Sequence, residues 1–355
     1  MNTGGVTKRL FDFCDSLFGH IRGGLSYVTV LSSTIFSAIS GSTLANAAGL
    51  GSMRIKAMTD RNYPKNFSTS LVTTASVLGP IIPPSILMII YGVTAGVSIQ
   101  KQFMGGIIPG ILYALMCCVM CFYYGKKYNL PVGDKFNIKR VGKEFVKAIW
   151  ALLAPAIILV GILTGVFTAT ESGAIACIYV VIIGMFVYKE MTWKDLVACL
   201  LSSAKTTGTI LLIAATASVM GFCLTYDMLP QRLAASLTSS ISSTVVMMLI
   251  FTLIYLFLGT IMEGSAIILT TVPIFVTICQ AMDIDPVYFG VFVSLLLSIA
   301  TVTPPVGTVM FVICKNNDLT IGQYTRNMLP WFGLMVVCCL LIAIFPQFLP
   351  NLLYS

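Results

Sequence analysis

The chain has 355 residues, of which 57% are hydrophobic and only 10% are charged, and its formal net charge is +8. Soluble domains carry about 25% charged residues, so this composition excludes a water-soluble enzyme. Charge-free runs of 19 to 35 residues recur along the whole length, which indicates an all-α polytopic membrane protein in a lipid bilayer. The basic residues are spread over short loops between apolar segments, and this spread argues against nucleic-acid binding.

The N-terminal region is polar and amphipathic, and we expect residues 1–22 to form an interfacial arm. Residues 23–53 carry no charged side chain for 31 residues, which is too long for one span of about 20 residues and too short for two. Their centre is Ser40-Gly41-Ser42, small and polar at the depth where a lone helix should be most apolar. Non-helical backbone is tolerated at that depth only inside protein or beside a wet cavity. We therefore predict a re-entrant helical hairpin that turns at Ser40 to Ser42.

A second charge-free stretch covers the 35 residues 66–100 and has Gly79-Pro80-Ile81-Ile82-Pro83-Pro84-Ser85 at its centre. Three prolines in five positions remove backbone donors and disfavour α geometry before each ring. The helix must end there and start again, so we predict a broken helix made of two half-helices.

The middle and the end of the chain contain ordinary membrane spans. The candidates are 105–125, 148–167, 172–188, 197–224 and 328–349. Seven of the 21 basic residues lie between Lys126 and Lys147, where only Asp134 and Glu144 oppose them. Because cytoplasmic loops carry such an excess of Lys and Arg, we place this loop on the cytoplasmic side.

Two features of the first part of the chain recur later at nearly constant spacing. The first feature is Ser40-Gly41-Ser42, which corresponds to Glu263-Gly264-Ser265. The second is Pro83-Pro84, which corresponds to Pro304-Pro305, and the two separations in sequence are almost the same. Each match alone is weak, but matches in the same order at nearly one offset indicate an internal repeat.

The second copy has the same two parts as the first. Residues 243–282 match the hairpin, and the 29 charge-free residues 286–314 are interrupted by Thr301-Val302-Thr303-Pro304-Pro305-Val306-Gly307. The loops beside the first hairpin are basic, whereas acidic residues flank the second. We therefore predict inverted repeats with two re-entrant hairpins and two broken helices, an arrangement that places substrate and ion sites near mid-membrane.

The repeats are unequal in length. Three apolar helices lie between Glu144 and the second tip at Glu263, whereas the first tip at Ser40 lies close to the start of the chain. We therefore expect that two to three N-terminal helices of the first repeat are missing from this chain.

Short motifs in a fixed order carry a family resemblance. They are Gly23-Gly24, Ile39-Ser40-Gly41-Ser42, Ala45-Asn46-Ala47-Ala48, Gly79 to Ser85, Tyr91-Gly92, Gly106-Ile107-Ile108-Pro109-Gly110, Thr168-Ala169-Thr170-Glu171, Asp285-Pro286 with Phe289-Gly290-Val291, and Thr303-Pro304-Pro305-Val306-Gly307. With them the chain resembles, over essentially its whole length, the large membrane subunit (DctM type) of tripartite ATP-independent periplasmic (TRAP) transporters. Asn46 and Glu263 depart from this resemblance, because it implies an acidic residue at the first position and aspartate at the second.

The resemblance implies sodium-driven import of organic acids, such as C4-dicarboxylates or sialic and sugar acids, across the bacterial inner membrane. It implies Na⁺ as the coupling ion, no organic cofactor, and two partners: a periplasmic substrate-binding protein and a small four-helix membrane subunit. It also implies an elevator-type transporter with a scaffold and a moving transport domain. The parts would be an interfacial arm (1–22), transport-domain segments (23–100 and 233–314), scaffold helices with the start of the second repeat (101–232), and a C-terminal scaffold helix (315–355).

Other functions also fit these residues. A binding-protein-independent carboxylate carrier or antiporter uses inverted hairpins too, and missing N-terminal helices are consistent with a truncated inactive subunit or a membrane scaffold. Proton coupling through Glu171 or Glu263 stays open beside sodium, because carboxylates in or near the membrane are functional candidates. Since no His cluster, nucleophile–base pair or phosphate loop is visible in the sequence, we do not expect an enzyme.

Sodium is a hard cation that prefers oxygen ligands, and discontinuous helices offer free carbonyl groups beside Ser and Thr hydroxyls. We predict two related Na⁺ sites. The first would use Ser40, Gly41 and Ser42, and the second Glu263, Gly264 and Ser265 with Thr303, Pro304 and Gly307.

A carboxylate substrate needs positive potential, which half-helix N-termini can supply after Ser42, Pro84 and Pro305. The candidate substrate residues are Ser42, Thr43, Ser85, Thr303 and Thr308. Arg54 and Lys56 lie about 18–21 Å along the helix from Ser42 at 1.5 Å per residue. We therefore interpret both as interfacial anchors.

Overall fold

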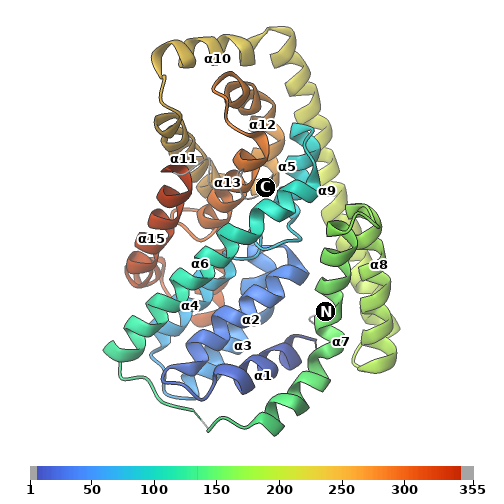
Figure 1. The fold of residues 1–355 in the computed structure, drawn as a ribbon, viewed down its shortest axis with the longest axis vertical. Helices are drawn as coiled ribbons and strands as arrows, with labels where there is room; N and C mark the ends of the chain where they lie inside the picture. The colour runs from blue at the N-terminus through green and yellow to red at the C-terminus, as the bar shows by residue number, and fades with distance from the viewer. Residues whose placement is uncertain (1–5, 134, 345–355) are drawn as a thin grey trace.

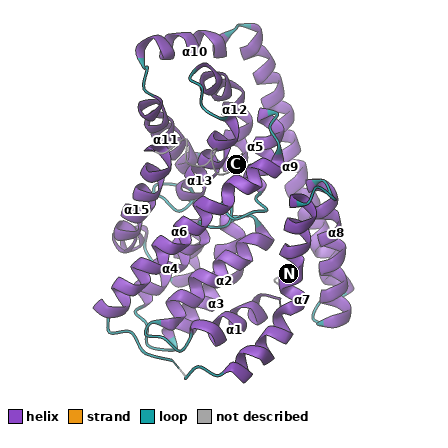
Figure 2. Ribbon diagram, viewed as in Figure 1, coloured by secondary structure: helices purple, strands orange, loops and turns teal. Residues whose placement is uncertain are grey.

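The computed structural model describes residues 6–133 and 135–344. This part of the chain contains fifteen α-helices and one π-helical turn, and no strand (Figure 2). Seven of its helices are long and apolar enough to cross a membrane. The prediction of an all-α polytopic membrane protein is therefore confirmed.

The first hairpin, called hairpin 1 below, consists of α2 (Gly24–Ser40) and α3 (Thr43–Thr59). Gly41 ends α2 in the left-handed conformation with φ 61°, which favours glycine because an L side chain is strained there. The side chain of Ser42 then accepts a hydrogen bond from Ala45 N–H and caps α3. The turn therefore lies where the sequence predicts it. The amphipathic helix α1 (Val6–Phe18) packs against α2.

The broken helix that follows consists of α4 (Lys65–Ser76) and α5 (Ile86–Ala95), separated by residues 77–85, called break 1. The prolines prevent a continuous helix, and Ser85 restarts it by accepting a hydrogen bond from Met88 N–H. The predicted interruption is confirmed.

The four predicted middle spans are confirmed as helices, but each helix begins before the predicted span, and residues 164–167 of the span 148–167 form a turn after the helix has ended. The helices are α6 (Ile99–Lys127), α7 (Ile138–Leu163), α8 (Ala169–Ile182), which continues as η1 (Ile183–Val187), and α9 (Trp193–Tyr226). A short helix that the sequence analysis did not predict, α10 (Leu229–Ser240), connects α9 to the second hairpin. In Figure 1 α10 lies across one end of the molecule.

The second hairpin, called hairpin 2, consists of α11 (Thr244–Ile261) and α12 (Gly264–Ala281), with Met262 and Glu263 between them. Its broken helix consists of α13 (Pro286–Ala300) and α14 (Thr308–Asn317), separated by residues 301–307, called break 2. The chain continues as α15 (Ile321–Ile344). This helix contains most of the predicted span 328–349, of which residues 345–349 lie outside the described residues.

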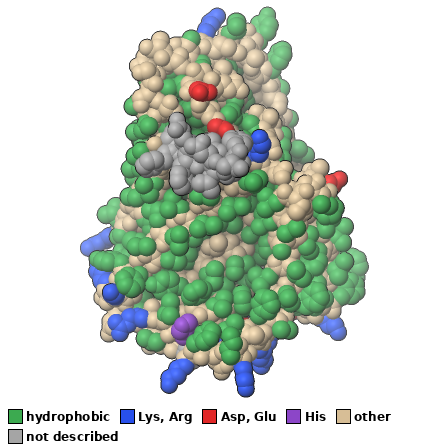
Figure 3. Space-filling view, in the orientation of Figure 1, with side chains coloured by type: hydrophobic (Ala, Val, Ile, Leu, Met, Phe, Trp, Pro, Cys, Tyr) green, Lys and Arg blue, Asp and Glu red, His purple; other side chains and the backbone are tan. Residues whose placement is uncertain are grey.

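The two hairpins approach the middle of the molecule from opposite ends. Figure 1 shows α2 and α3 in the lower half, α11 and α12 in the upper half, and α5 and α13 between them. All residues of α13 from Val287 to Ala300 are buried, as are those of α4 from Phe67 to Ser76. Lys and Arg side chains gather at the lower end of the face in Figure 3. The broken helices thus form the core between the hairpins, and the basic end agrees with the predicted cytoplasmic side.

Candidate ion and substrate site

The tip of hairpin 1 (Ser40 to Ser42) lies against break 1. Ile86 N–H donates a hydrogen bond to the Gly41 carbonyl oxygen at 3.4 Å. A Cβ atom on Gly41 would lie 2.8 Å from the carbonyl oxygen of Pro84, so only glycine allows this approach. The buried hydroxyl of Ser40 has no hydrogen-bond partner among the described residues. The tip therefore offers an uncommitted hydroxyl oxygen on the residue before Gly41, which itself contacts the start of α5.

A second close approach joins the same tip to Gly79, where a Cβ atom would lie 2.5 Å from the carbonyl carbon of Ser42. Ser85, which is fully buried, caps α5 on this side. The structure thus brings together Ser40, Gly41, Ser42 and Ser85, all of them site residues predicted from the sequence.

Thr43 connects hairpin 1 to the second repeat. Its hydroxyl lies 2.9 Å from the Ser298 hydroxyl, which donates to the Val77 carbonyl oxygen at 2.7 Å. Both hydroxyl groups are buried. The sequence analysis missed Ser298, although a serine just before break 2 in a mostly apolar helix was a usable signal.

The tip of hairpin 2 (Glu263 to Ser265) lies beside the same end of α5. A Cβ atom on Gly264 would lie 3.3 Å from a methyl group of Leu87 and 3.7 Å from Leu297. Glu263 is exposed and caps α12, because its carboxylate accepts hydrogen bonds from Ser265 N–H at 2.8 Å and Ala266 N–H at 3.3 Å. The two tips therefore flank the first turn of α5, one at Gly41 and the other at Gly264.

The predicted second ion site needs break 2 and the tip of hairpin 2 to lie in direct contact, and the structure shows no hydrogen bond between them among the described residues. The Thr303 hydroxyl donates to the Ile299 carbonyl oxygen at 2.8 Å, and Thr308 is exposed. The chain folds tightly around Gly307, where a Cβ atom would lie 2.6 Å from the Thr301 oxygen. Break 2 thus places carbonyl oxygens close together at Gly307.

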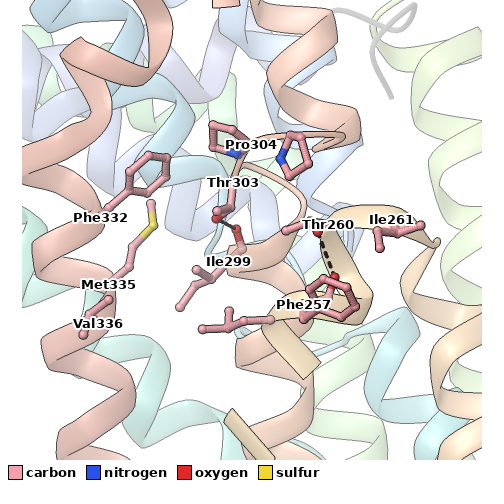
Figure 4. A pocket seen from close by; sticks show the side chains of 11 residues that line it. Phe257, Thr260, Ile261, Ile299, Thr303, Pro304, Phe332, Met335 and Val336 are labelled. Carbon is pink, nitrogen blue, oxygen red and sulfur yellow. Dashed lines mark hydrogen bonds between the residues drawn. The ribbon is translucent and has the colours of Figure 1, made fainter. Parts of the chain in front are cut away.

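Thr303 and Pro304 also line a cavity of about 360 Å³ between α11, break 2 and α15 (Figure 4). Apart from Thr303 and Thr260, its lining side chains are apolar, and the Thr260 hydroxyl donates to the Phe257 carbonyl oxygen at 2.8 Å. This cavity therefore lacks uncommitted donors for a carboxylate.

The interpretation of Arg54 as an interfacial anchor is wrong. Its side chain is fully buried, and its Nη1 donates hydrogen bonds to the hydroxyl of Ser33 at 2.6 Å and to Oδ1 of Asn46 at 3.0 Å. The guanidinium reaches back along α3 into hairpin 1, because helical side chains point toward the N-terminus. Lys56, by contrast, is exposed.

Comparison with known proteins agrees with this architecture. The family model for the tripartite ATP-independent periplasmic transporter, DctM component, matches residues 1–348. The chain is 37% identical over 356 residues to the sialic acid TRAP transporter permease protein SiaT of Haemophilus influenzae, covering 99% of this chain but 58% of that protein. It is 36% identical over 354 residues to the C4-dicarboxylate TRAP transporter large permease protein DctM of Pseudomonas aeruginosa, covering 99% and 83%.

The crystal structure of the YdaH transporter of Alcanivorax borkumensis has a similar fold, with a TM-score of 0.65 at 15% identity over 98% of this chain and 84% of that one. The relatives are transporter permeases, so the expectation that the chain is not an enzyme is confirmed. The chain belongs to the DctM component family of tripartite ATP-independent periplasmic transporters.

Proposed function

We propose that the chain is the large permease subunit of a sodium-coupled transporter that imports organic acids by an elevator mechanism. The observation that carries this proposal is the meeting of both hairpin tips at the first turn of α5, directly after break 1. Interrupted helices that meet inside a membrane protein are the arrangement in which secondary transporters bind ions and substrates.

Sodium fits the first tip by its chemistry. Ser40 supplies a hydroxyl oxygen without a partner, and Ser42 and Ser85 supply two more beside the carbonyl oxygen of Pro84. For the second predicted site, Glu263 offers a carboxylate and break 2 offers backbone oxygens near Gly307, and a sodium ion would have to draw the two together. These are hard oxygen ligands, which suits Na⁺.

A carboxylate is the substrate class that the helix ends favour. The N-termini of α3 and α5 begin at the tip of hairpin 1 and at break 1, and helix N-termini attract anions through unpaired N–H groups and the helix dipole. The two relatives named above carry sialic acid and C4-dicarboxylates in their names, and both compounds are carboxylic acids.

An elevator movement needs the two repeats to travel as one body. Thr43 of hairpin 1 contacts Ser298 of α13, and Gly264 of hairpin 2 packs on Leu87 of α5, so each hairpin is held by the other repeat's broken helix. This interlocking supports a single transport domain that slides against the remaining helices. A periplasmic binding protein and a small membrane subunit would complete the transporter.

The test is uptake of radiolabelled succinate and sialic acid into proteoliposomes that contain the chain and its small membrane subunit. Each substrate is offered with and without a sodium gradient, and with and without the purified binding protein. We expect uptake only when the sodium gradient and the binding protein are both present. Uptake without the binding protein would show an independent carrier. Uptake without a sodium gradient would contradict sodium coupling, and no uptake in any arm would contradict import of these two acids.

A further inference from the structure

Arg54 places a positive charge inside hairpin 1. Its side chain is fully buried, although it belongs to the residue type that is almost never buried without a partner. Asn46, which holds it, lies four residues after Ser42, or about 6 Å along the axis of α3. The guanidinium therefore lies close behind the tip of hairpin 1 and is shielded from solvent.

The groups that surround this charge are neutral. Asn46 accepts from Arg54 through Oδ1, and its Nδ2 donates to the Ser37 hydroxyl at 3.0 Å and to the Ser33 carbonyl oxygen at 3.3 Å. These two hydrogen bonds from Nδ2 orient the side-chain amide of Asn46 so that its oxygen faces Arg54. Nε and Nη2 of Arg54 are buried and have no hydrogen-bond partner among the described residues. Hairpin 1 itself contains no Asp or Glu between Gly23 and Thr59.

The neighbouring helix α1 does not supply the missing negative charge. The buried carboxylate of Asp15 is already bound by Arg61 at 3.1 Å and by Arg140 at 2.7 Å. Cys14 is close enough to interact with the charge of Arg54, but burial raises the pKa of its thiol to about 12, so it is neutral at physiological pH. No acidic side chain of the described chain forms an ion pair with Arg54.

An arginine side chain cannot lose its proton in a protein, so burial cannot neutralise this charge. A buried charge without a partner costs several kcal/mol, which a counter-ion offsets. We propose that a small inorganic anion, chloride in the cell, binds to Nε and Nη2 of Arg54 as the counter-ion inside hairpin 1. Because Nε and Nη2 are both buried, a small anion fits this position better than an organic acid, and the site does not depend on transport.

The experiment measures the unfolding temperature of the purified full chain in detergent, in sodium chloride, sodium bromide and sodium gluconate at equal sodium concentration and ionic strength. Gluconate is a large organic anion, and we expect it not to reach the buried Nε and Nη2 of Arg54. We expect the wild-type chain to unfold roughly 2–4 °C higher in chloride and bromide than in gluconate, because a ligand of the folded state stabilises it. Equal unfolding temperatures in the three salts would overturn the proposal, and bound water alone would give that result.

Asn46→Asp is the informative variant, because it places a carboxylate where Oδ1 already lies 3.0 Å from Nη1. We expect it to raise the unfolding temperature in gluconate and to abolish the difference between the salts. Arg54→Gln should abolish the difference as well, because it removes the charge that the anion would neutralise. The matched control is Lys56→Gln, an exposed cation two residues away, which should keep the wild-type difference. A difference that persists in Asn46→Asp would be a general salt effect and would overturn the proposal.

Discussion

Gly41 is the residue whose replacement tests the contact between hairpin 1 and α5 most sharply. Its φ of 61° lies in the left-handed region, where an L residue costs about 1–2 kcal/mol. In Gly41→Ala the new Cβ would also lie 2.8 Å from the Pro84 carbonyl oxygen, 3.2 Å from Ile86 N and 3.3 Å from Ser85 Cα. These are backbone atoms that cannot rotate away, so the tip must move off α5. We expect Gly41→Ala to lose sodium-dependent uptake.

Gly96 provides the matched control for this change. It has nearly the same conformation, with φ 68°, but nothing lies within 4 Å of a Cβ atom placed there. Gly96→Ala therefore carries the backbone strain without the displaced contact. We expect both variants to lose about 1–2 kcal/mol of stability from strain, and only Gly41→Ala to lose uptake in the proteoliposome assay. If Gly41→Ala transported with the sodium dependence of Gly96→Ala, the tip of hairpin 1 would not form an ion site against α5.

Three further replacements test other parts of the site. Glu263→Gln keeps a capping oxygen for α12 but removes the charge, so we expect a higher sodium concentration for half-maximal uptake; an unchanged sodium titration would show that the carboxylate is not a ligand. Thr303→Val keeps the shape of the side chain, and we expect it to shift the same titration upward, whereas an unaltered curve would remove Thr303 from the second site. Ser298→Ala leaves the Thr43 hydroxyl and the Val77 carbonyl oxygen without their partner, which should cost about 1–3 kcal/mol of stability. Thermal unfolding of the purified chain measures this loss, and an unchanged unfolding temperature would contradict the structural role of Ser298.

The turns and breaks could be predicted from the sequence because their causes are local. Gly41 supplies a left-handed residue at the tip, and Pro80, Pro83 and Pro84 remove the backbone donors that a helix needs. The helix limits were less predictable. Spans drawn from charge-free runs began too late, because helices such as α6 include charged residues such as Lys101 near their start, and the span 148–167 ended past the end of α7 at Leu163.

The contacts within the site depend on which segments meet, and motifs and their spacing along the chain do not reveal that. Ser298 was missed because its partners, Thr43 and Val77, belong to the first repeat and are far from it in the sequence. Arg54 was misplaced because its distance was measured along the helix axis, whereas its long side chain extends back toward Asn46 inside a hairpin that excludes solvent. The division into a transport domain and a scaffold stays a prediction.

A density map of the full chain in a lipid nanodisc with sodium would test the central claim most directly. We predict that α2–α3 and α11–α12 turn back at Gly41 and Glu263, that both tips contact the first turn of α5, and that density for an ion lies beside Ser40. A map in which the tips are separated from α5, with no ion density at either one, would contradict the account.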